Sequence, residues 1–169
     1  MQMCLNQDQK GFGHVSPNPM VGCVIVHNNQ VVSASYHKIY GGPHAEVNAI
    51  EQALQKTTDL SQSTLYVSLE PCSHFGKTPP CSNLIIQHKI KKVVIASLDP
   101  NPKVSSVEKL KAAGIEVEVM NEPSAIILNK RFFTQHNQHR PNFILKRTIE
   151  CFSGLKPVPN KLGMNRQAF

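Results

Sequence analysis

Two thiols, an imidazole and a carboxylate stand out in the sequence because together they can hold and use a metal ion. Cys72 and Cys81 are the ends of the segment Cys-Ser-His-Phe-Gly-Lys-Thr-Pro-Pro-Cys, and His44 and Glu46 belong to a His-Ala-Glu triplet upstream. Cysteine and histidine are zinc ligands, and catalytic zinc sites use three protein ligands and keep a fourth position open. We therefore predict that His44, Cys72 and Cys81 bind one zinc ion per chain and leave Glu46 to carry protons.

The periodicity after Pro43 separates the roles of His44 and Glu46. Apolar residues recur with helical spacing from Val47 to Leu54, and proline is common where helices begin. Residues two apart in a helix are separated by about 200° of rotation, so His44 and Glu46 cannot reach one ion from the same face. A base beside the metal is the role that remains for Glu46. Zinc with such a glutamate is typical of enzymes that hydrolyse an amino group off a nucleobase-like ring.

Both cysteines are expected where helical turns begin. Pro71-Cys72 follows the predicted strand Thr64–Leu69, at the carboxyl end where ligand sites of α/β sheets collect. Pro79-Pro80-Cys81 is predicted to begin a helix that runs to about His88. Unpaired amides at such helix starts favour a thiolate. His74 lies between the cysteines and is an alternative ligand, although a position lining the pocket suits it better.

The remaining sequence alternates strand and helix patterns, which indicates a layered α/β domain. Besides Thr64–Leu69, the predicted strands are Met20–Val26, Gln30–His37, Lys92–Ser97 and Ile115–Val119. The other predicted helices are a short one within residues 1–10, Val107–Ala113 and Pro123–Asn129. Asp99 and Asn101 follow a strand, so we expect them at the same sheet edge as Cys72. A further strand is expected to begin at Phe143, and residues 150–169 lose periodicity.

Composition narrows the classes of protein. The 169 residues carry a net charge of +7, of which residues 1–88 contribute −1 and residues 89–169 contribute +8. The whole chain has no Trp and three Tyr, so it offers few of the stacking surfaces that bind single-stranded bases, and nucleic acid is a disfavoured partner. No apolar run approaches the roughly 20 residues that span a bilayer, and no secretory signal is visible, so we expect a cytoplasmic protein without membrane contact. Five cysteines, an odd number, do not suggest a disulfide framework.

Several motifs resemble a known family. They are Ser-Pro-Asn-Pro-Met-Val-Gly-Cys at 16–23, Tyr-His at 36–37, Gly-Pro-His-Ala-Glu-Val at 42–47, Leu-Glu-Pro-Cys-Ser-His at 69–74, Thr-Pro-Pro-Cys at 78–81 and Asp-Pro-Asn-Pro at 99–102. Over about residues 1–146 the chain is similar to the deaminase domain of the bifunctional riboflavin-biosynthesis deaminase/reductase. The eight residues between the two cysteines distinguish that family from cytidine and tRNA-adenosine deaminases, which usually have two there.

The resemblance implies a three-layer α/β/α fold of the cytidine-deaminase type with a central mixed sheet, zinc on His44, Cys72 and Cys81, and Glu46 as proton shuttle. It also implies a hydrolytic deaminase acting on 2,5-diamino-6-ribosylamino-4(3H)-pyrimidinone 5′-phosphate. The residues that it implies for substrate binding are Asn18, His37, His74, Lys77, Asp99 and Asn101. Lys77 is the only cation between the two cysteines, so we expect it to neutralise the phosphate.

The end of the chain departs from the family. Family members continue after Lys146 into a reductase domain, whereas residues 147–169 are predicted to be a loose tail, the remnant of such a start. We therefore expect no NADP on this chain, and leave open a separate reductase and a homo-oligomer. Two alternatives also remain open, namely a nucleic-acid deaminase that uses the basic half and a zinc-stabilised module without enzymatic activity.

Overall fold

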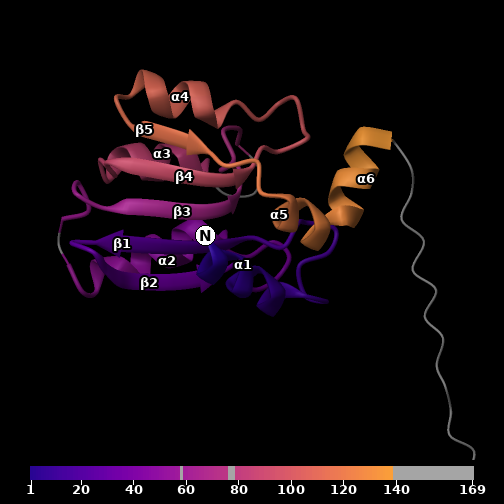
Figure 1. Ribbon diagram of the computed structural model, residues 1–169, viewed down its shortest axis with the longest axis horizontal. Coiled ribbons are helices and arrows are strands. Elements are labelled where there is room, and N and C mark those ends of the chain that lie inside the picture. The colour runs from indigo at the N-terminus through magenta and orange to yellow at the C-terminus, as the bar shows by residue number, and fades with distance from the viewer. Residues whose placement is uncertain (58, 76–78, 139–169) are drawn as a thin grey trace, which may run out of the picture.

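A five-stranded sheet forms the middle layer of the protein in a computed structural model that describes residues 1–57, 59–75 and 79–138 (Figure 1). The strand order is β2-β1-β3-β4-β5. The strands are β1 (Gly22–His27), β2 (Gln30–Tyr36), β3 (Thr64–Leu69), β4 (Lys92–Ser97) and β5 (Glu116–Val119). Strand β1 runs antiparallel to both β2 and β3, whereas β3, β4 and β5 are mutually parallel. The predicted mixed sheet is confirmed.

Helices cover both faces of this sheet and complete three layers. The helices are α1 (Gln2–Asp8), α2 (Ala45–Leu54), α3 (Cys81–Gln87), α4 (Ser106–Ala112), α5 (Pro123–Leu128) and α6 (Lys130–Gln138), with a 3-10 turn at Gln9–Gly11. Figure 1 shows α2 and α3 behind the sheet and α1 in front of it. Helix α2 packs on β1 and β2, and α4 on β5, while α1 and α5 pack on the other side against β1 and β4. The three-layer prediction is therefore confirmed.

Strand β1 shows how the sequence produces two buried faces. Its central residues Cys23, Val24 and Ile25 are all buried, as expected of a continuous apolar run in a central strand. Cys23 and Ile25 face the main core with Ala49 and Ile50 of α2. On the opposite face, a smaller cluster unites Leu5, Ala96 and Ala125 between α1, β4 and α5.

Tight contacts position the first hairpin and helix. Asn28 and Asn29 connect β1 to β2 with φ of 48° and 59°, the left-handed conformation that a two-residue hairpin turn needs. Gly22 lies so close to α1 that an added Cβ would collide with the Cys4 carbonyl oxygen and lie 2.6 Å from Asp8 Oδ1. The missing side chain at Gly22 therefore allows α1 to lie directly on the sheet.

The structure corrects two local predictions and adds one helix. No helical turn begins at Pro71-Cys72, where the chain after β3 is irregular. His44 is the N-cap of α2, one residue before the helix, with φ −70° and ψ 165°. Helix α6 was not predicted, because Lys130–Gln138 has only one pair of adjacent phenylalanines among polar residues. The predicted strand at Phe143 and the tail 147–169 lie outside the described residues.

Candidate active site

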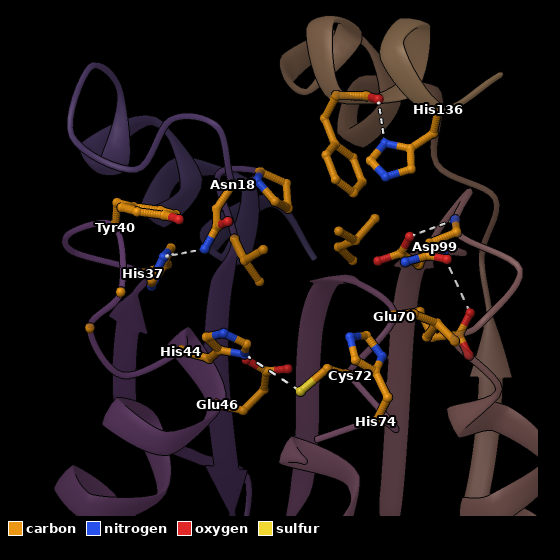
Figure 2. A pocket seen from close by; sticks show the side chains of 18 residues that line it. Asn18, His37, Tyr40, His44, Glu46, Glu70, Cys72, His74, Asp99 and His136 are labelled. Carbon is orange, nitrogen blue, oxygen red and sulfur yellow. Dashed lines mark hydrogen bonds between the residues drawn. The ribbon is translucent and has the colours of Figure 1, made fainter. Parts of the chain in front are cut away.

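Four chain segments converge at one edge of the sheet because of the strand directions. Strands β3 and β4 end there, and since β1 is antiparallel to β3, β1 begins there and β2 ends there. The segments before β1 and after β2, β3 and β4 therefore meet, and with the start of α2 they enclose a cavity of about 330 Å³ (Figure 2). This edge is where ligand sites of α/β sheets form. The lining includes eight of the ten site residues proposed from the sequence: Asn18, His37, His44, Glu46, Cys72, His74, Asp99 and Asn101.

His44, Cys72 and Cys81 form a compact group at the floor of the cavity. Their ligand atoms all lie within 4.8 Å of one another. His44 Nδ1 is 3.6 Å from Cys72 Sγ and 3.3 Å from Cys81 Sγ. Zinc bonds of about 2.3 Å to sulfur and about 2.1 Å to nitrogen give tetrahedron edges of roughly 3.6 Å between nitrogen and sulfur and roughly 3.8 Å between the sulfurs. The group therefore fits one zinc ion, with Nδ1 as the nitrogen that His44 turns toward the thiols.

The chemistry of the two thiols also fits a divalent metal. Hydrogen bonding from the Cys81 thiol, supported by His44 and the Cys81 backbone amide, lowers the pKa of Cys72 to about 4. The same thiol–thiolate pair and burial raise the pKa of Cys81. A thiolate next to a thiol is an arrangement in which a divalent metal can displace the remaining proton. The hydrogen bond to Cys72 is also the main cause that raises the pKa of His44.

The sequence predicted that amides of a helical turn beginning at Cys72 would stabilise its thiolate. In the structure this amide comes instead from the start of α3. Cys81 N donates to Cys72 Sγ at 3.2 Å, and Ser82 N donates to Cys72 O at 3.1 Å. Cys81 is the first residue of α3, as predicted, so its amide has no earlier carbonyl within the helix to bond. The thiolate of Cys72 is therefore stabilised by the helix that carries the second cysteine.

Glu46 lies in the first turn of α2, beside the ligand group rather than within it. It lines the cavity but is only 3% exposed, and Figure 2 shows its side chain close to Cys72 and His44. Burial raises the pKa of Glu46 to about 7, and the neighbouring Cys72 thiolate adds to the effect. His44 is the cap of α2 and Glu46 is the second residue of that helix, so the two side chains leave the backbone on different sides of the helix start.

His37 and Asn18 form a hydrogen-bonded pair on the wall beside His44. His37 Nδ1 lies 3.0 Å from the Pro43 carbonyl, which can only accept, so Nδ1 carries the proton and Nε2 is an acceptor. Asn18 Nδ2 is 3.4 Å from that Nε2 and can donate to it. Burial lowers the pKa of His37, which keeps the ring neutral. The His37 ring also meets His44 edge to face, with centroids 5.4 Å apart.

The loop after β4 combines turn chemistry with a place on the cavity wall. Asp99 Oδ1 accepts from Asn101 N at 2.8 Å, and Asn101 Oδ1 accepts from Lys103 N at 3.1 Å. Both side chains also line the cavity, so turn and pocket roles are compatible here. Burial raises the pKa of Asp99.

Glu70 holds this loop in place from below. One of its oxygens accepts from Ser106 N at 2.8 Å, Ser106 Oγ at 3.1 Å and Val107 N at 3.3 Å, which caps α4. The other oxygen accepts from Asp99 N at 3.4 Å. Glu70 thereby connects the end of β3 to the Asp99 loop and to the start of α4.

Two predicted residues have different outcomes. His74 lines the cavity but is not a member of the metal-ligand group, so among the described residues the alternative ligand is not supported. Lys77 lies outside the described residues, and its expected contact with phosphate stays a prediction.

The cavity contains residues that the sequence did not single out. They are Tyr40, Glu70, Phe132 and His136, together with apolar or small residues around them. Phe132 and His136 come from α6, and their i,i+4 spacing is the signal that could have placed them on one helix face. Glu70 is part of the Leu-Glu-Pro-Cys motif, so the sequence shows that it lies two residues before Cys72. It does not show the hydrogen-bond partners of Glu70.

Comparison with known proteins agrees with this fold and site. Residues 1–97 match the family described as the cytidine and deoxycytidylate deaminase zinc-binding region. Fold and site thus define a zinc-binding deaminase of this class.

More specific relatives come from riboflavin biosynthesis. The chain is 50% identical over 149 residues to riboflavin biosynthesis protein RibD of Aquifex aeolicus, a match that covers 86% of this chain and 41% of RibD. It is 52% identical over 136 residues to the diaminohydroxyphosphoribosylamino-pyrimidine deaminase of Buchnera aphidicola subsp. Schizaphis graminum, covering 79% of this chain and 90% of that protein. The crystal structure of the bifunctional deaminase/reductase of Thermotoga maritima superposes with a TM-score of 0.80 and 45% identity, over 83% of this chain and 41% of that one. The chain therefore belongs to the RibD-type deaminases, although it spans only about two fifths of the first of these relatives.

Proposed function

We propose that the chain is a hydrolytic deaminase of 2,5-diamino-6-ribosylamino-4(3H)-pyrimidinone 5′-phosphate, producing 5-amino-6-ribosylaminouracil 5′-phosphate and ammonia. The observation that carries the proposal is a buried carboxylate, Glu46, beside a His/Cys/Cys group at the floor of a cavity of about 330 Å³. The names of the relatives at 50% and 52% identity support the substrate class. We assign the deaminase domain to residues 1–146.

His44, Cys72 and Cys81 would hold the zinc ion in this proposal. Bound there, zinc supplies Lewis-acid chemistry that makes water a nucleophile near neutral pH. The backbone amide of Cys81 and the imidazole of His44 keep the Cys72 sulfur in its thiolate form. His37 packs edge to face on His44 and limits the orientations of that ring.

Glu46 would move protons at the reacting atoms. It takes a proton from the attacking water, whose oxygen forms a bond to the ring carbon that bears the amino group. It delivers that proton to the adjacent ring nitrogen. It then takes the second proton from the oxygen now bonded to the ring carbon and delivers it to the amino group, so that the carbon–nitrogen bond breaks, a carbonyl forms and ammonia leaves. One carboxylate serves every transfer because water, ring nitrogen and amino group are all neighbours of the same carbon.

The other cavity residues would hold the substrate. Asn18 keeps its amide oxygen available while its Nδ2 group faces His37. Asp99 and Asn101 are fixed by their turn, and His74 faces the cavity from the loop after β3. Lys77 remains our candidate for the phosphate. The four described cysteines form no disulfide with one another, which suits the reducing environment of the cytoplasm.

Ammonia release from the authentic ribotide by zinc-loaded protein is the decisive measurement. We expect turnover with the ribotide, and none with single-stranded RNA that contains cytidine and adenosine. Glu46→Gln is the matched control, since it preserves size and removes the proton carrier. Turnover on RNA instead of the ribotide would support a nucleic-acid deaminase, and zinc content without turnover on either would support a non-enzymatic module.

A further inference from the structure

Helix α6 supplies part of the cavity wall, although it follows the region matched to the deaminase family by more than thirty residues of chain. We propose that His136 of α6 is a specificity-determining residue that accepts a hydrogen bond from a ribose hydroxyl of the substrate. The inference rests on the proposed function, and extends it by assigning to a residue the recognition of a ribosyl group rather than a deoxyribosyl one.

The orientation of the His136 ring is fixed by its own helix. Nδ1 lies 3.0 Å from the carbonyl oxygen of Phe132, one turn earlier. A carbonyl can only accept, so Nδ1 carries the proton, and Nε2 of the neutral ring is left as an acceptor. The ring also packs on the Phe132 ring, with centroids 4.4 Å apart and planes tilted by 50°. These two contacts leave Nε2 as the atom that His136 presents to the cavity.

Asp99 lies next to His136 and offers a second acceptor. Figure 2 shows His136 pointing from α6 toward Asp99. Asp99 Oδ1 is used by Asn101 N, and within the described residues no hydrogen bond is formed by Asp99 Oδ2 or by His136 Nε2. Two neighbouring acceptors require a ligand with neighbouring donors. The vicinal hydroxyls of ribose meet this requirement, whereas a phosphate brings only acceptors and a negative charge beside the Asp99 carboxylate.

The position of His136 along the cavity matches this part of the substrate. The reacting ring carbon must lie at the floor, within reach of Glu46 and the His44, Cys72 and Cys81 group. In Figure 2, His136 and Asp99 lie at the other end of the cavity from Glu46. The ribosylamino substituent leads away from the reacting carbon, so the sugar is the group that extends toward α6.

The test compares two substrates on three proteins. The substrates are the ribotide and its 2′,3′-dideoxyribosyl analogue, and the proteins are the wild type, His136→Ala and His136→Gln. A neutral hydrogen bond of typical strength corresponds to a loss of about three- to tenfold in kcat/KM. We expect kcat/KM of His136→Ala to fall by this factor with the ribotide, mainly because KM rises. With the dideoxy analogue, kcat/KM should stay at the wild-type value. His136→Gln should recover part of it, because its side-chain oxygen replaces the acceptor.

Gln135→Ala is the matched control, an exposed residue of the same helix that should change neither substrate. The inference is overturned if His136→Ala leaves kcat/KM of the ribotide unchanged. It is also overturned if both substrates lose the same factor, which would indicate that His136 only supports α6. The dephosphorylated riboside serves as a further substrate. A loss that persists with the dideoxy analogue but disappears with the riboside would assign His136 to the phosphate and overturn the inference as well.

A binding measurement separates this inference from the proposed function. Calorimetry gives the dissociation constants of the deaminated ribotide and its dideoxy analogue for the same zinc-loaded proteins, without any turnover. A dissociation constant about three- to tenfold higher for His136→Ala than for the wild type, with the ribosyl compound only, supports the role of His136 even if no ammonia is released. If the wild type turns over the ribotide but this difference is absent, only the inference on His136 fails. If the wild type neither binds nor converts the ribotide, both fail.

Discussion

Two regions of the protein bury a carboxylate, the floor of the cavity around Glu46 and the contact between α1 and β1 around Asp8. Burial is the main cause in both, and it raises each pKa to about 7. Both side chains are almost completely inaccessible, with 3% exposure for Glu46 and 0% for Asp8. The two groups are therefore nearly alike in the property most often used to find catalytic acids and bases.

Their surroundings differ in what a carboxylate could act on. Glu46 lines the cavity and neighbours the thiolate of Cys72 and the ring of His44. Asp8 does not line that cavity; it packs against Gly22, and neither of its oxygens has a hydrogen bond of good geometry, although Ser68 and the Gly22 amide moderate its pKa. A perturbed pKa therefore indicates burial, and a catalytic role requires in addition a cavity with reactive partners. Substitutions in the two regions should separate the effects on activity from those on stability.

Removing a metal ligand should give the largest effect. Cys72→Ala deletes one of the three groups that fit zinc, so we expect zinc content to fall from one per chain to near zero and turnover to disappear. Since the three ligands come from separate segments, loss of the metal should also lower the melting temperature. Elemental analysis and thermal unfolding measure both results. Cys23→Ala, at a buried cysteine outside the ligand group, is the control that should retain zinc. Full zinc content in Cys72→Ala would contradict the ligand assignment.

Glu46→Gln should leave zinc and fold in place but lower kcat by at least about a hundredfold, the lower range for loss of a general acid/base. The amide has the size of the carboxylate and cannot exchange the protons. Zinc content, melting temperature and ammonia release should be measured on the same preparation. If the variant loses its zinc, Glu46 is itself a ligand and the division of roles is wrong.

The sequence predicted most of the fold because the strands carry strong local signals. Strands Thr64–Leu69 and Lys92–Ser97 appear with the expected bounds, since both are short runs rich in β-branched, aromatic and aliphatic residues. Cys81 begins α3 as expected, because prolines precede it. The grouping of His44, Cys72 and Cys81 could be expected from the sequence as well, since each of them belongs to a short motif with a recognisable neighbour.

The sequence did not reveal features that depend on long-range packing. Helix α6 has a weak apolar pattern, and it is the tertiary contact at the cavity that makes Phe132 and His136 relevant. The irregular chain at Cys72 was predicted as a helical turn because proline favours helix starts. In the structure, however, that thiolate receives its amide from Cys81, nine residues later. In the sequence, the charged residue Asp8 makes the first helix look weakly amphipathic. Its burial could not be predicted, because it depends on how closely α1 approaches Gly22.

Asp8→Asn should change stability and its pH dependence while activity stays close to that of the wild type. In the folded protein the Asp8 carboxyl keeps its proton up to about pH 7, whereas in the unfolded chain it ionises near 3.8. The wild type should therefore lose stability as pH rises from about 4 to 7, by up to about 4 kcal/mol at 1.36 kcal/mol per pH unit. Asparagine does not titrate, so the free energy of unfolding of the variant should rise relative to that of the wild type between about pH 4 and pH 7. Above pH 7 the difference should stay constant.

Urea unfolding of both proteins at pH 5 and pH 8 measures this difference. Glu51→Gln is the control, because Glu51 is an exposed carboxylate of α2 and should give the same difference at both pH values. A loss of activity in Asp8→Asn at unchanged zinc content would mean that the α1 region reaches the chemistry, and the contrast between the two regions would no longer hold.

Glu70→Gln tests a third buried carboxylate, which lines the cavity as Glu46 does but is fully occupied by hydrogen bonds. Its two oxygens accept from Ser106, Val107 and Asp99, and an amide has only one oxygen for these donors. The NH2 group must then face a backbone N–H, either at Asp99 or at the start of α4. Because the contact to Asp99 N is the longer one, at 3.4 Å, we expect the amide to turn that way and release the loop that carries Asp99 and Asn101.

The expected result is a rise in KM of about two- to tenfold with kcat nearly unchanged, since a hydrogen bond to a charged group contributes about 1.5 to 3 kcal/mol and only part of it acts on the loop. Steady-state kinetics with the ribotide measures the two constants separately. Glu108→Gln, at an exposed residue in the first turn of α4, is the control for the charge at that helix start. A fall in kcat comparable to that of Glu46→Gln would place Glu70 among the proton carriers. In that case a carboxylate whose oxygens are all occupied by hydrogen bonds could still carry protons, and these hydrogen bonds would not distinguish Glu70 from Glu46.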